Sequence, residues 1–159
     1  MPQQSNSAPL DHETRLQEGD HHSIKLWLRL LTCSSLIERR VRGELRKRFN
    51  TTLPRFDFMS QLERNPAGLT MGELSRRMMV SGGNISGIAS QLVKEGLVDR
   101  NTVPENRRTF IVKLTPQGNE LFAKMAIEHE RWIVDLLGHL SLDEVEDLML
   151  LLKRIKQAT

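Results

Sequence analysis

Residues 69–118 specify the architecture of this chain: LTMGELSRRMMVSGGNISGIASQLVKEGLVDRNTVPENRRTFIVKLTPQG. Apolar residues recur every three or four positions in the first half, which is typical of short helices, and the SGGN sequence interrupts them. After Gly96 the pattern becomes β-branched and alternating, as expected for two strands at 97–100 and 109–114. This order predicts a helix-turn-helix followed by a β-hairpin wing.

Capping residues place the ends of these helices. Thr70 and Glu73 have the spacing of a capping box, which predicts the start of one helix. We expect Ser81 to cap the next helix and Gly96 to end it in the left-handed conformation. Residues 53–64 predict an earlier short helix with a proline in its first turn.

Long helices are predicted on both sides of this core. One spans about 21–49, and two more, separated by a second capping box at Ser141 and Glu144, follow residue 116. The first half of the long N-terminal helix and the run at 148–152 are apolar nearly all round, so both must be covered. We therefore expect a core shared between two copies. The predicted division is a flexible N-terminal tail at 1–19, a helical dimerisation region at 20–50 and 116–159, and a DNA-binding domain at 51–115.

Composition narrows the class of protein. The chain has 159 residues, of which 38% are hydrophobic, and no apolar run approaches the length of a membrane span. The N-terminus lacks a secretory pattern, so we expect a cytoplasmic protein without membrane contact. The single cysteine excludes a disulfide framework within one chain. No catalytic set or nucleotide loop stands out, and the five histidines do not form a ligand set, so we expect neither an enzyme nor a bound metal or cofactor. Those histidines are His12, His21, His22, His129 and His139.

Charge is distributed unevenly along the chain. Residues 1–52 and 53–115 each carry a net charge of +3, whereas residues 116–159 carry −3. Basic N-terminal and middle parts with an acidic C-terminal part are expected of a protein that binds a polyanion through one part only. The same pattern also fits ordinary solvated helix faces.

The second helix of the motif has the composition of a recognition helix. Glycine inside a helix costs roughly 1 kcal/mol relative to alanine, so a glycine-rich outer face suggests close approach to another surface, such as the major groove. Asn and Gln side chains can contact adenine, and Ser and Lys can contact bases or phosphates. The candidate DNA-binding residues of this helix are Ser81, Gly82, Gly83, Asn84, Ser86, Gly87, Ser90, Gln91 and Lys94.

The tip of the predicted hairpin carries Arg107 and Arg108. An arginine on a thin β-loop beside a recognition helix can enter the minor groove, where the potential is strongly negative over A·T-rich sequence. We therefore add both arginines to the candidate DNA-binding residues.

Three motifs in order give residues 52–118 a resemblance to the winged-helix core of the MarR family of bacterial transcription factors. LTMGELS at 69–75 resembles the family's second motif helix, and LVKEGLVDR at 92–100 resembles the end of its recognition helix with the first wing strand. NRRTFIVKLTPQG at 106–118 resembles its wing signature. With the flanking helices the resemblance covers about residues 20–157.

This resemblance implies a homodimeric regulator, most simply a repressor, that binds double-stranded DNA at an inverted-repeat operator. Half-sites about one helical turn (~34 Å) apart are expected from two-fold symmetry. It also implies that Arg108 is the minor-groove arginine. The chain departs from the family at Asn106, where an aspartate is usual, so the amide cannot form an ion pair with a neighbouring arginine.

The resemblance further implies release by a small molecule bound between the dimer base and the winged helix. An aromatic acid or an aromatic acyl-coenzyme A thioester is the expected class of effector, and the arginines near residue 42 could pair with its phosphates. The candidate effector-binding residues are Trp27, Leu31, Arg42, Phe56 and Met59. The four apolar residues could instead be ordinary core packing, and Arg42 could equally flank DNA or be solvated.

Two alternatives remain open at this point. Cys33 could sense oxidants, although its place on the apolar seam of a helix predicts a small buried hydrophobe. A helix-mediated protein-interaction module would explain the apolar terminal helices but not the glycine-rich face or the basic wing.

Overall fold

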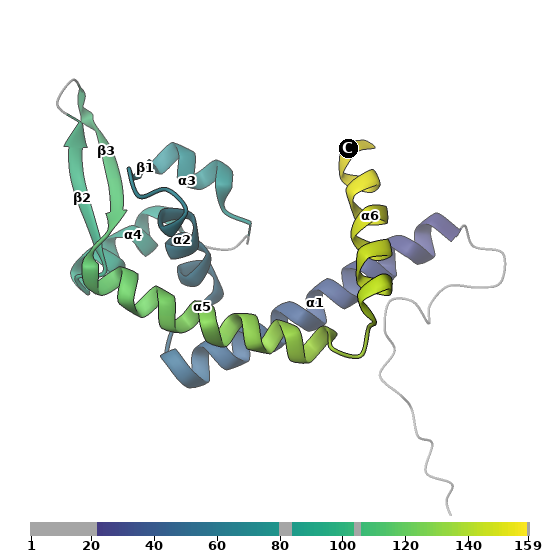
Figure 1. Cartoon of the computed structure of the whole chain (residues 1–159). Helices are drawn as coiled ribbons and strands as arrows, with labels where there is room; N and C mark the ends of the chain where they lie inside the picture. Colours follow the sequence, from purple (N-terminus) through teal and green to yellow (C-terminus); the bar gives the residue numbers. More distant parts are fainter. Residues whose placement is uncertain (1–21, 80–83, 104–105, 159) are drawn as a thin grey trace, which may run out of the picture.

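The computed structural model describes residues 22–79, 84–103 and 106–158, so the predicted tail lies outside the described residues. Figure 1 shows a winged helix at one end, two long helices running away from it, and a last helix standing clear of it. The described helices are α1 (His22–Phe49), α2 (Leu53–Glu63), α3 (Met71–Arg77), α4 (Ile85–Lys94), α5 (Pro116–Leu137) and α6 (Leu142–Ala158). The strands are β1 (Leu69–Thr70), β2 (Val98–Val103) and β3 (Asn106–Leu114).

The sheet has three antiparallel strands in the order β1-β3-β2. The predicted hairpin is confirmed, but β1 was not expected. It pairs Leu69 with Val112 and Thr70 with Ile111 immediately before α3 begins. Two residues are too few to show a strand period, so only the pairing partner reveals this strand.

The hairpin is longer than expected, and this corrects the position of the two arginines. β2 runs to Val103 and β3 begins at Asn106, with those two residues paired. Arg107 and Arg108 therefore lie within β3 and not at the tip. The Asn106 side chain accepts a hydrogen bond from the backbone N–H of Arg108 at 3.1 Å, which stabilises the start of the strand.

Helix caps confirm most of the predicted boundaries. Thr70 and Glu73 form the reciprocal capping box, and Ser141 and Glu144 form the second. The start of α4 differs from expectation. Asn84, and not Ser81, is its N-cap, and the Asn84 side chain accepts from the N–H of Gly87 at 3.1 Å. Asparagine caps a helix as well as serine does, so composition alone could not choose between them. The helix begins at Ile85, so a single glycine lies within it, not three.

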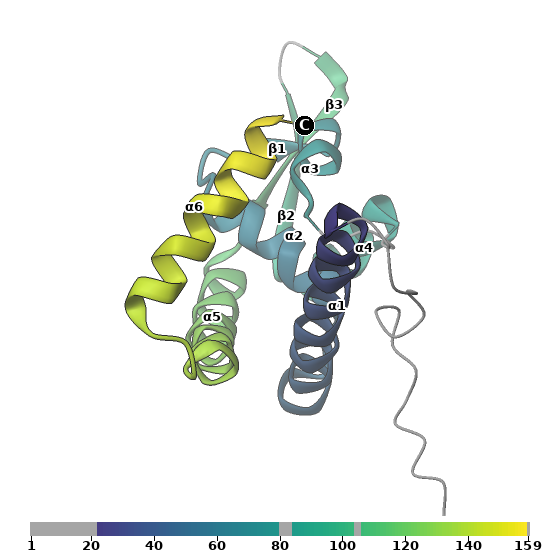
Figure 2. The same cartoon turned by 90° about the vertical axis from the view of Figure 1, so that its right-hand side faces the viewer.

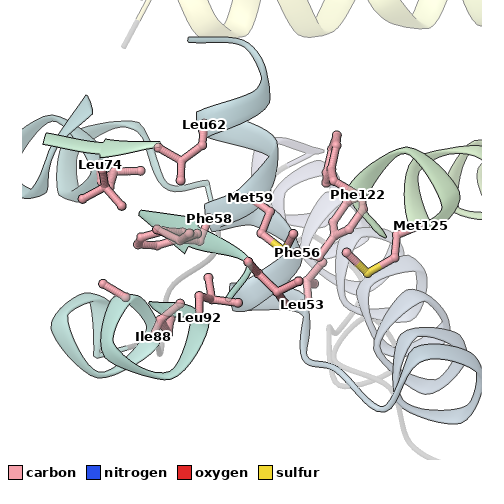
Figure 3. Close-up of a cluster of buried hydrophobic side chains, with 14 of the residues drawn as sticks. Leu53, Phe56, Phe58, Met59, Leu62, Leu74, Ile88, Leu92, Phe122 and Met125 are labelled. Carbon is pink, nitrogen blue, oxygen red and sulfur yellow. The ribbon is translucent and has the colours of Figure 1, made fainter. Parts of the chain in front are cut away.

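The core forms around α2, as Figure 3 shows. Phe58 and Leu62 point from α2 toward Leu74 of α3 and Leu92 of α4, and all four are almost fully buried. On another side of α2, Phe56 stacks on Phe122 of α5 with ring centroids 5.4 Å apart. Each fully buried large apolar side chain contributes about 1.5–3 kcal/mol. These contacts hold the recognition elements and the long helices to the same central helix.

The start of α5 is docked closely against the base of the wing. The Thr115 hydroxyl donates to the Gly96 carbonyl at 2.7 Å, and the Thr115 N–H donates to the Leu97 carbonyl at 3.1 Å. A Cβ at Gly118 would lie 1.9 Å from the Leu97 carbonyl oxygen, closer than any real contact. Only glycine at residue 118 allows this approach.

Replacing Gly118 with alanine is therefore expected to destabilise the protein, although alanine favours helices. The clash is with backbone and forces α5 away from the wing, which should cost about 1–3 kcal/mol or more. Urea unfolding measures the change. Gly72→Ala is the matched control, because its Cβ would meet only the end of the Arg76 side chain at 3.6 Å. Equal stability of Gly118→Ala and the wild type would contradict this docking.

Candidate nucleic-acid interface

Helix α4 presents a polar face away from the core. Ile88, Ala89 and Leu92 are buried, whereas the residues opposite them are exposed. The predicted candidates Asn84, Ser86, Ser90, Gln91 and Lys94 lie on this exposed side, and Gly87 is half-buried. Ser81, Gly82 and Gly83 lie outside the described residues.

The exposed residues of α4 differ in how far their side-chain hydrogen-bonding groups are already used within the protein. The Asn84 amide oxygen is used by the cap, and the Ser90 hydroxyl donates to the Ser86 carbonyl at 2.9 Å. Within the described part of the chain, the Gln91 and Lys94 side chains make no hydrogen bond or ion pair. Gly87 could hold a Cβ at ordinary contact distance from Asn84, so internal packing does not require glycine there. Its small size suits contact with something outside the chain.

The wing carries two cations on one face. In the register of the hairpin, Arg100 pairs with Val112 and Thr102 with Phe110, so alternation places Arg100, Phe110 and Arg108 on the same face. The Arg100 guanidinium lies over the Phe110 ring, 3.9 Å from its centroid. This contact stabilises an exposed arginine without neutralising its charge.

These cations adjoin the start of α3. Arg100 and Arg108 line one hollow together with Thr70, Met71 and Gly72. Arg108 is exposed, and none of the described carboxylates pairs with it. The Asn106 side-chain amide accepts a hydrogen bond from the backbone N–H of Arg108, which orders the strand. This contact does not involve the Arg108 guanidinium. Of Arg107 only its place in β3 is described.

Asp57 is a positioning residue that the sequence analysis missed. It lies in α2 with 6% of its surface exposed, and its Oδ2 accepts a hydrogen bond from the Met79 backbone N–H at 2.7 Å. Its Oδ1 accepts from Gln61 at 3.3 Å. The carboxylate thereby holds the segment that follows α3, where the turn toward α4 begins. A lone acidic residue between Phe56 and Phe58 is the sequence signal for a buried acceptor of this kind.

The far end of α4 is also fixed to α2. The Arg55 guanidinium forms a two-pronged ion pair with Glu95, the C-cap of α4, with Nη1–Oε1 at 2.9 Å. This pairing holds the pKa of the Glu95 carboxyl below its usual value. Forty residues separate the partners, so no local pattern could reveal the pair. Asp57 and Arg55 thus fix the end of α3 and the end of α4 to the same helix, α2.

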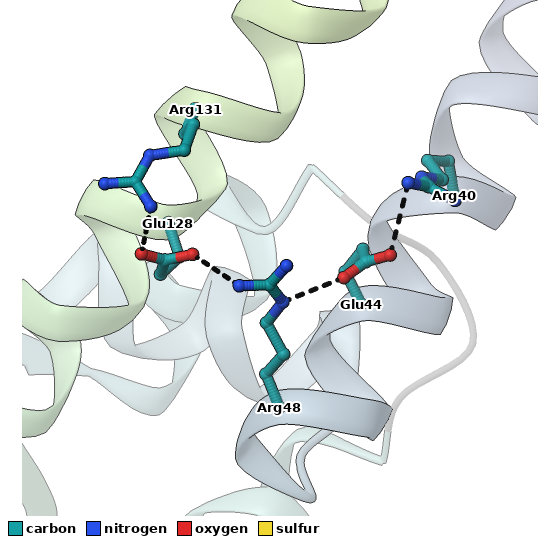
Figure 4. A network of polar contacts seen from close by, with 5 residues as sticks. All are labelled: Arg40, Glu44, Arg48, Glu128 and Arg131. Atoms are coloured by element: carbon teal, nitrogen blue, oxygen red, sulfur yellow. Dashed lines mark hydrogen bonds and ion pairs between the residues drawn. The ribbon is translucent and has the colours of Figure 1, made fainter.

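A second ion-pair network joins the long helices (Figure 4). Arg48 of α1 contacts Glu44 on its own helix at 3.0 Å and Glu128 of α5 at 2.9 Å. Arg40 and Arg131 extend the network at its two ends. Arg40 therefore already has a carboxylate partner, and so does Arg42, which contacts Glu38 at 3.0 Å.

The five candidate effector residues occupy three different surroundings. Phe56 and Met59 are core residues, and Phe56 also lies against His129, with ring centroids 4.8 Å apart. Burial lowers the pKa of His129. Trp27 is 61% exposed and Leu31 39% exposed on the first half of α1, whereas Arg42 lines a hollow beside α4. The chain by itself does not gather these five residues into one cleft.

Cys33 is exposed, which corrects the expectation of a buried thiol. The seam on which it lies is itself uncovered in a single chain, because neighbouring Leu36 and Leu31 are exposed as well. Within the described ranges, no three His, Cys, Asp or Glu side chains lie close enough to hold a metal ion. None of the described helices has the length and apolar character needed to cross a membrane.

Comparison with known proteins agrees with this architecture. The model of the MarR family matches residues 49–109. A MarR family transcriptional regulator from Silicibacter pomeroyi is 31% identical, with a TM-score of 0.75 over 86% of this chain and 94% of its own. The chain belongs to the MarR family. This family and the matched relatives are transcriptional regulators and not enzymes, as the sequence predicts.

Other MarR-like proteins match over different extents. A putative transcriptional regulatory protein for the hcr operon of Thauera aromatica is 33% identical over 97 residues, which is 61% of this chain and 58% of the relative. An uncharacterized HTH-type transcriptional regulator of Bacillus subtilis is 27% identical over 55% of this chain and 54% of its own length. The chain thus spans little more than half of these curated relatives. The structure of the PcaV regulator from Streptomyces coelicolor, in complex with its natural ligand, is 23% identical. It covers 90% of this chain and 99% of its own, with a TM-score of 0.65, and shows a shared fold.

Replacement of Asp57 by alanine is expected to loosen the helix-turn-helix. The Met79 N–H would lose its acceptor in a part-buried place, which should cost about 1–3 kcal/mol of stability. Hydrogen exchange should show faster opening after α3 than in α5. Asp57→Asn is the control, since the amide oxygen can still accept from Met79. If Asp57→Ala and Asp57→Asn are equally stable, the hydrogen bond does not have this role.

Proposed function

We propose that this chain is a sequence-specific DNA-binding regulator that acts as a homodimeric repressor and is released by a small molecule. The observation that carries the proposal is the exposed polar face of α4 beside the wing, where none of the described carboxylates pairs with Arg100 or Arg108. An exposed surface with polar and positively charged side chains can bind a DNA groove, which is bordered by negatively charged phosphates.

In this proposal α4 enters the major groove and the wing reaches the neighbouring minor groove. Gln91 can contact adenine and Lys94 can contact bases or phosphates, while Gly87 allows the backbone to approach closely. Arg108 enters the minor groove, and Arg100 supports it with a second positive charge. Ser81, Gly82, Gly83 and Arg107 remain candidate contacts on the strength of the sequence.

Arg108→Ala is expected to weaken binding to the operator by roughly 1–3 kcal/mol, the size of a good groove contact. The operator is first obtained by selecting bound duplexes from a random pool, and fluorescence anisotropy at fixed salt then gives the affinities. Arg39→Ala, an exposed arginine on α1, controls for loss of charge. Unchanged affinity of Arg108→Ala would contradict the wing assignment.

The uncovered apolar surface of the long helices supports the homodimer. Helix α6 has no buried residue and stands clear of the winged helix in Figure 1, whereas Figure 2 shows α5 running alongside α1. Leu26 and Leu30 of α1 face Leu148, Leu151 and Leu152 of α6 across an open apolar groove. Monomers rarely expose a contiguous face of this kind, so we assign 20–50 and 116–159 to dimerisation and 51–115 to DNA binding.

Leu151→Glu is expected to shift the protein from dimer to monomer in sedimentation equilibrium, because it places a charge on the apolar groove. Lys153→Glu on the same helix does not line the groove and should leave the dimer intact. A wild-type protein that is a stable single copy at micromolar concentration would exclude the homodimer.

We also propose an aromatic acid or its coenzyme A thioester as the releasing molecule. The fold shared with PcaV, a regulator solved with its natural ligand, supports ligand control in general. Trp27 and Leu31 are exposed on α1, apart from the buried Phe56 and Met59, so in this proposal the second copy completes the site around them. The anisotropy assay tests this when benzoate and benzoyl-coenzyme A are added to the bound operator. Release by neither compound would remove this class of effector.

A further inference from the structure

A basic hollow lies beside α4, away from the wing and at one edge of the exposed face of the helix. It is formed where the end of α1 and the start of α2 approach one side of α4, and its volume is about 440 Å³. Arg42 and Arg46 line it from α1, Thr52 and Arg55 from α2, and Gln91 and Ile88 from α4. Three cations from two helices therefore face one concave surface.

The charges around this hollow are only partly balanced. None of the described residues that line it carries a carboxylate. Arg42 pairs with Glu38 outside the hollow, and Arg55 pairs with Glu95. Arg46 is exposed and has no carboxylate partner among the residues that the structure describes. The hollow therefore attracts an anion and has donors left to bind one.

The hollow is separate from the side of α2 that contacts α5. Phe56 faces Phe122 and His129 of α5, whereas Pro54 and Arg55 line the hollow next to α4. Arg42 therefore belongs with α4 and not with the apolar effector candidates Phe56 and Met59.

Gln91 links this hollow to DNA, because it lies on the exposed side of α4 and also lines the hollow. A helix in the major groove has the sugar-phosphate backbone along each flank. We propose that the hollow receives a backbone phosphate of the bound duplex, held chiefly by Arg46 with Arg42 and Arg55 around it. This inference rests on the proposed DNA binding and extends the contact surface onto α1.

The test measures how duplex affinity depends on salt, using fluorescence anisotropy with a duplex of arbitrary sequence. A phosphate contact is independent of sequence and contributes about 0.9 to the slope of log K against log salt concentration. Arg46→Gln should lower the slope by about 2 for a dimer, one contact in each copy. The ratio of the wild-type affinity to the Arg46→Gln affinity should therefore fall about tenfold between roughly 50 and 200 mM salt.

Lys47→Gln is the matched control. Lys47 is exposed in the same last turn of α1 and the change removes the same charge, but it does not line the hollow. It should alter the slope by less than half as much as Arg46→Gln, and Arg46→Lys should restore most of the slope. Thermal unfolding should show that all three variants remain folded, since Arg46 is exposed.

The outcomes separate this inference from the proposed function. A wild type that binds no duplex overturns both. If the wild type has a steep salt dependence and Arg46→Gln leaves its slope unchanged, the phosphate site alone is overturned. The same holds if Lys47→Gln lowers the slope as much as Arg46→Gln does. Thermal unfolding with inorganic phosphate distinguishes a free anion from the duplex. Stabilisation of the wild type but not of Arg46→Gln, together with unchanged duplex slopes, would assign the hollow to a free anion and overturn the DNA contact.

Discussion

Burial of α2 on more than one side is the constraint on which the other elements depend. Phe58 and Leu62 fill the space against α3 and α4, while Phe56 stacks on Phe122 of α5. A helix held in this way cannot shift toward one neighbour without opening a cavity against another, and such cavities cost several kcal/mol. The orientation of the winged helix relative to the long helices is therefore set by α2 and not by the connecting loops.

Polar contacts transfer this constraint to the ends of α3 and α4. Asp57 holds the backbone at Met79 after α3, and Arg55 holds Glu95 at the end of α4, so α2 fixes both the end of α3 and the end of α4. On the other side, Arg48 joins α1 to α5 through Glu44 and Glu128. Contacts of α2 with α5 and with α4 therefore connect the long helices to the recognition helix. Such a connection is the property a ligand-released DNA-binding protein requires.

Local patterns predicted the elements well, and long-range partners explain what they missed. The capping boxes at Thr70 and Ser141 and the change of period after Gly96 placed helices and wing correctly. The strand β1 exists only because Val112 and Ile111 pair with it, and the Arg55–Glu95 pair joins residues 40 positions apart. The α4 start was misplaced because Ser81 and Asn84 are equally suitable caps. The candidate effector residues were the least predictable, since a ligand cleft depends on how separate helices meet.

The two halves of α1 have opposite chemistry, and the fold puts each where that chemistry is useful. Its first half is apolar and exposed, facing the equally exposed α6 across the open groove. Its second half is basic and ends beside α4, where the hollow gathers Arg42, Arg46 and Arg55. One straight helix therefore runs from the surface suited to a second copy to the surface suited to phosphate. In the proposed homodimer, α1 would therefore connect the contact between the copies to the basic hollow beside α4.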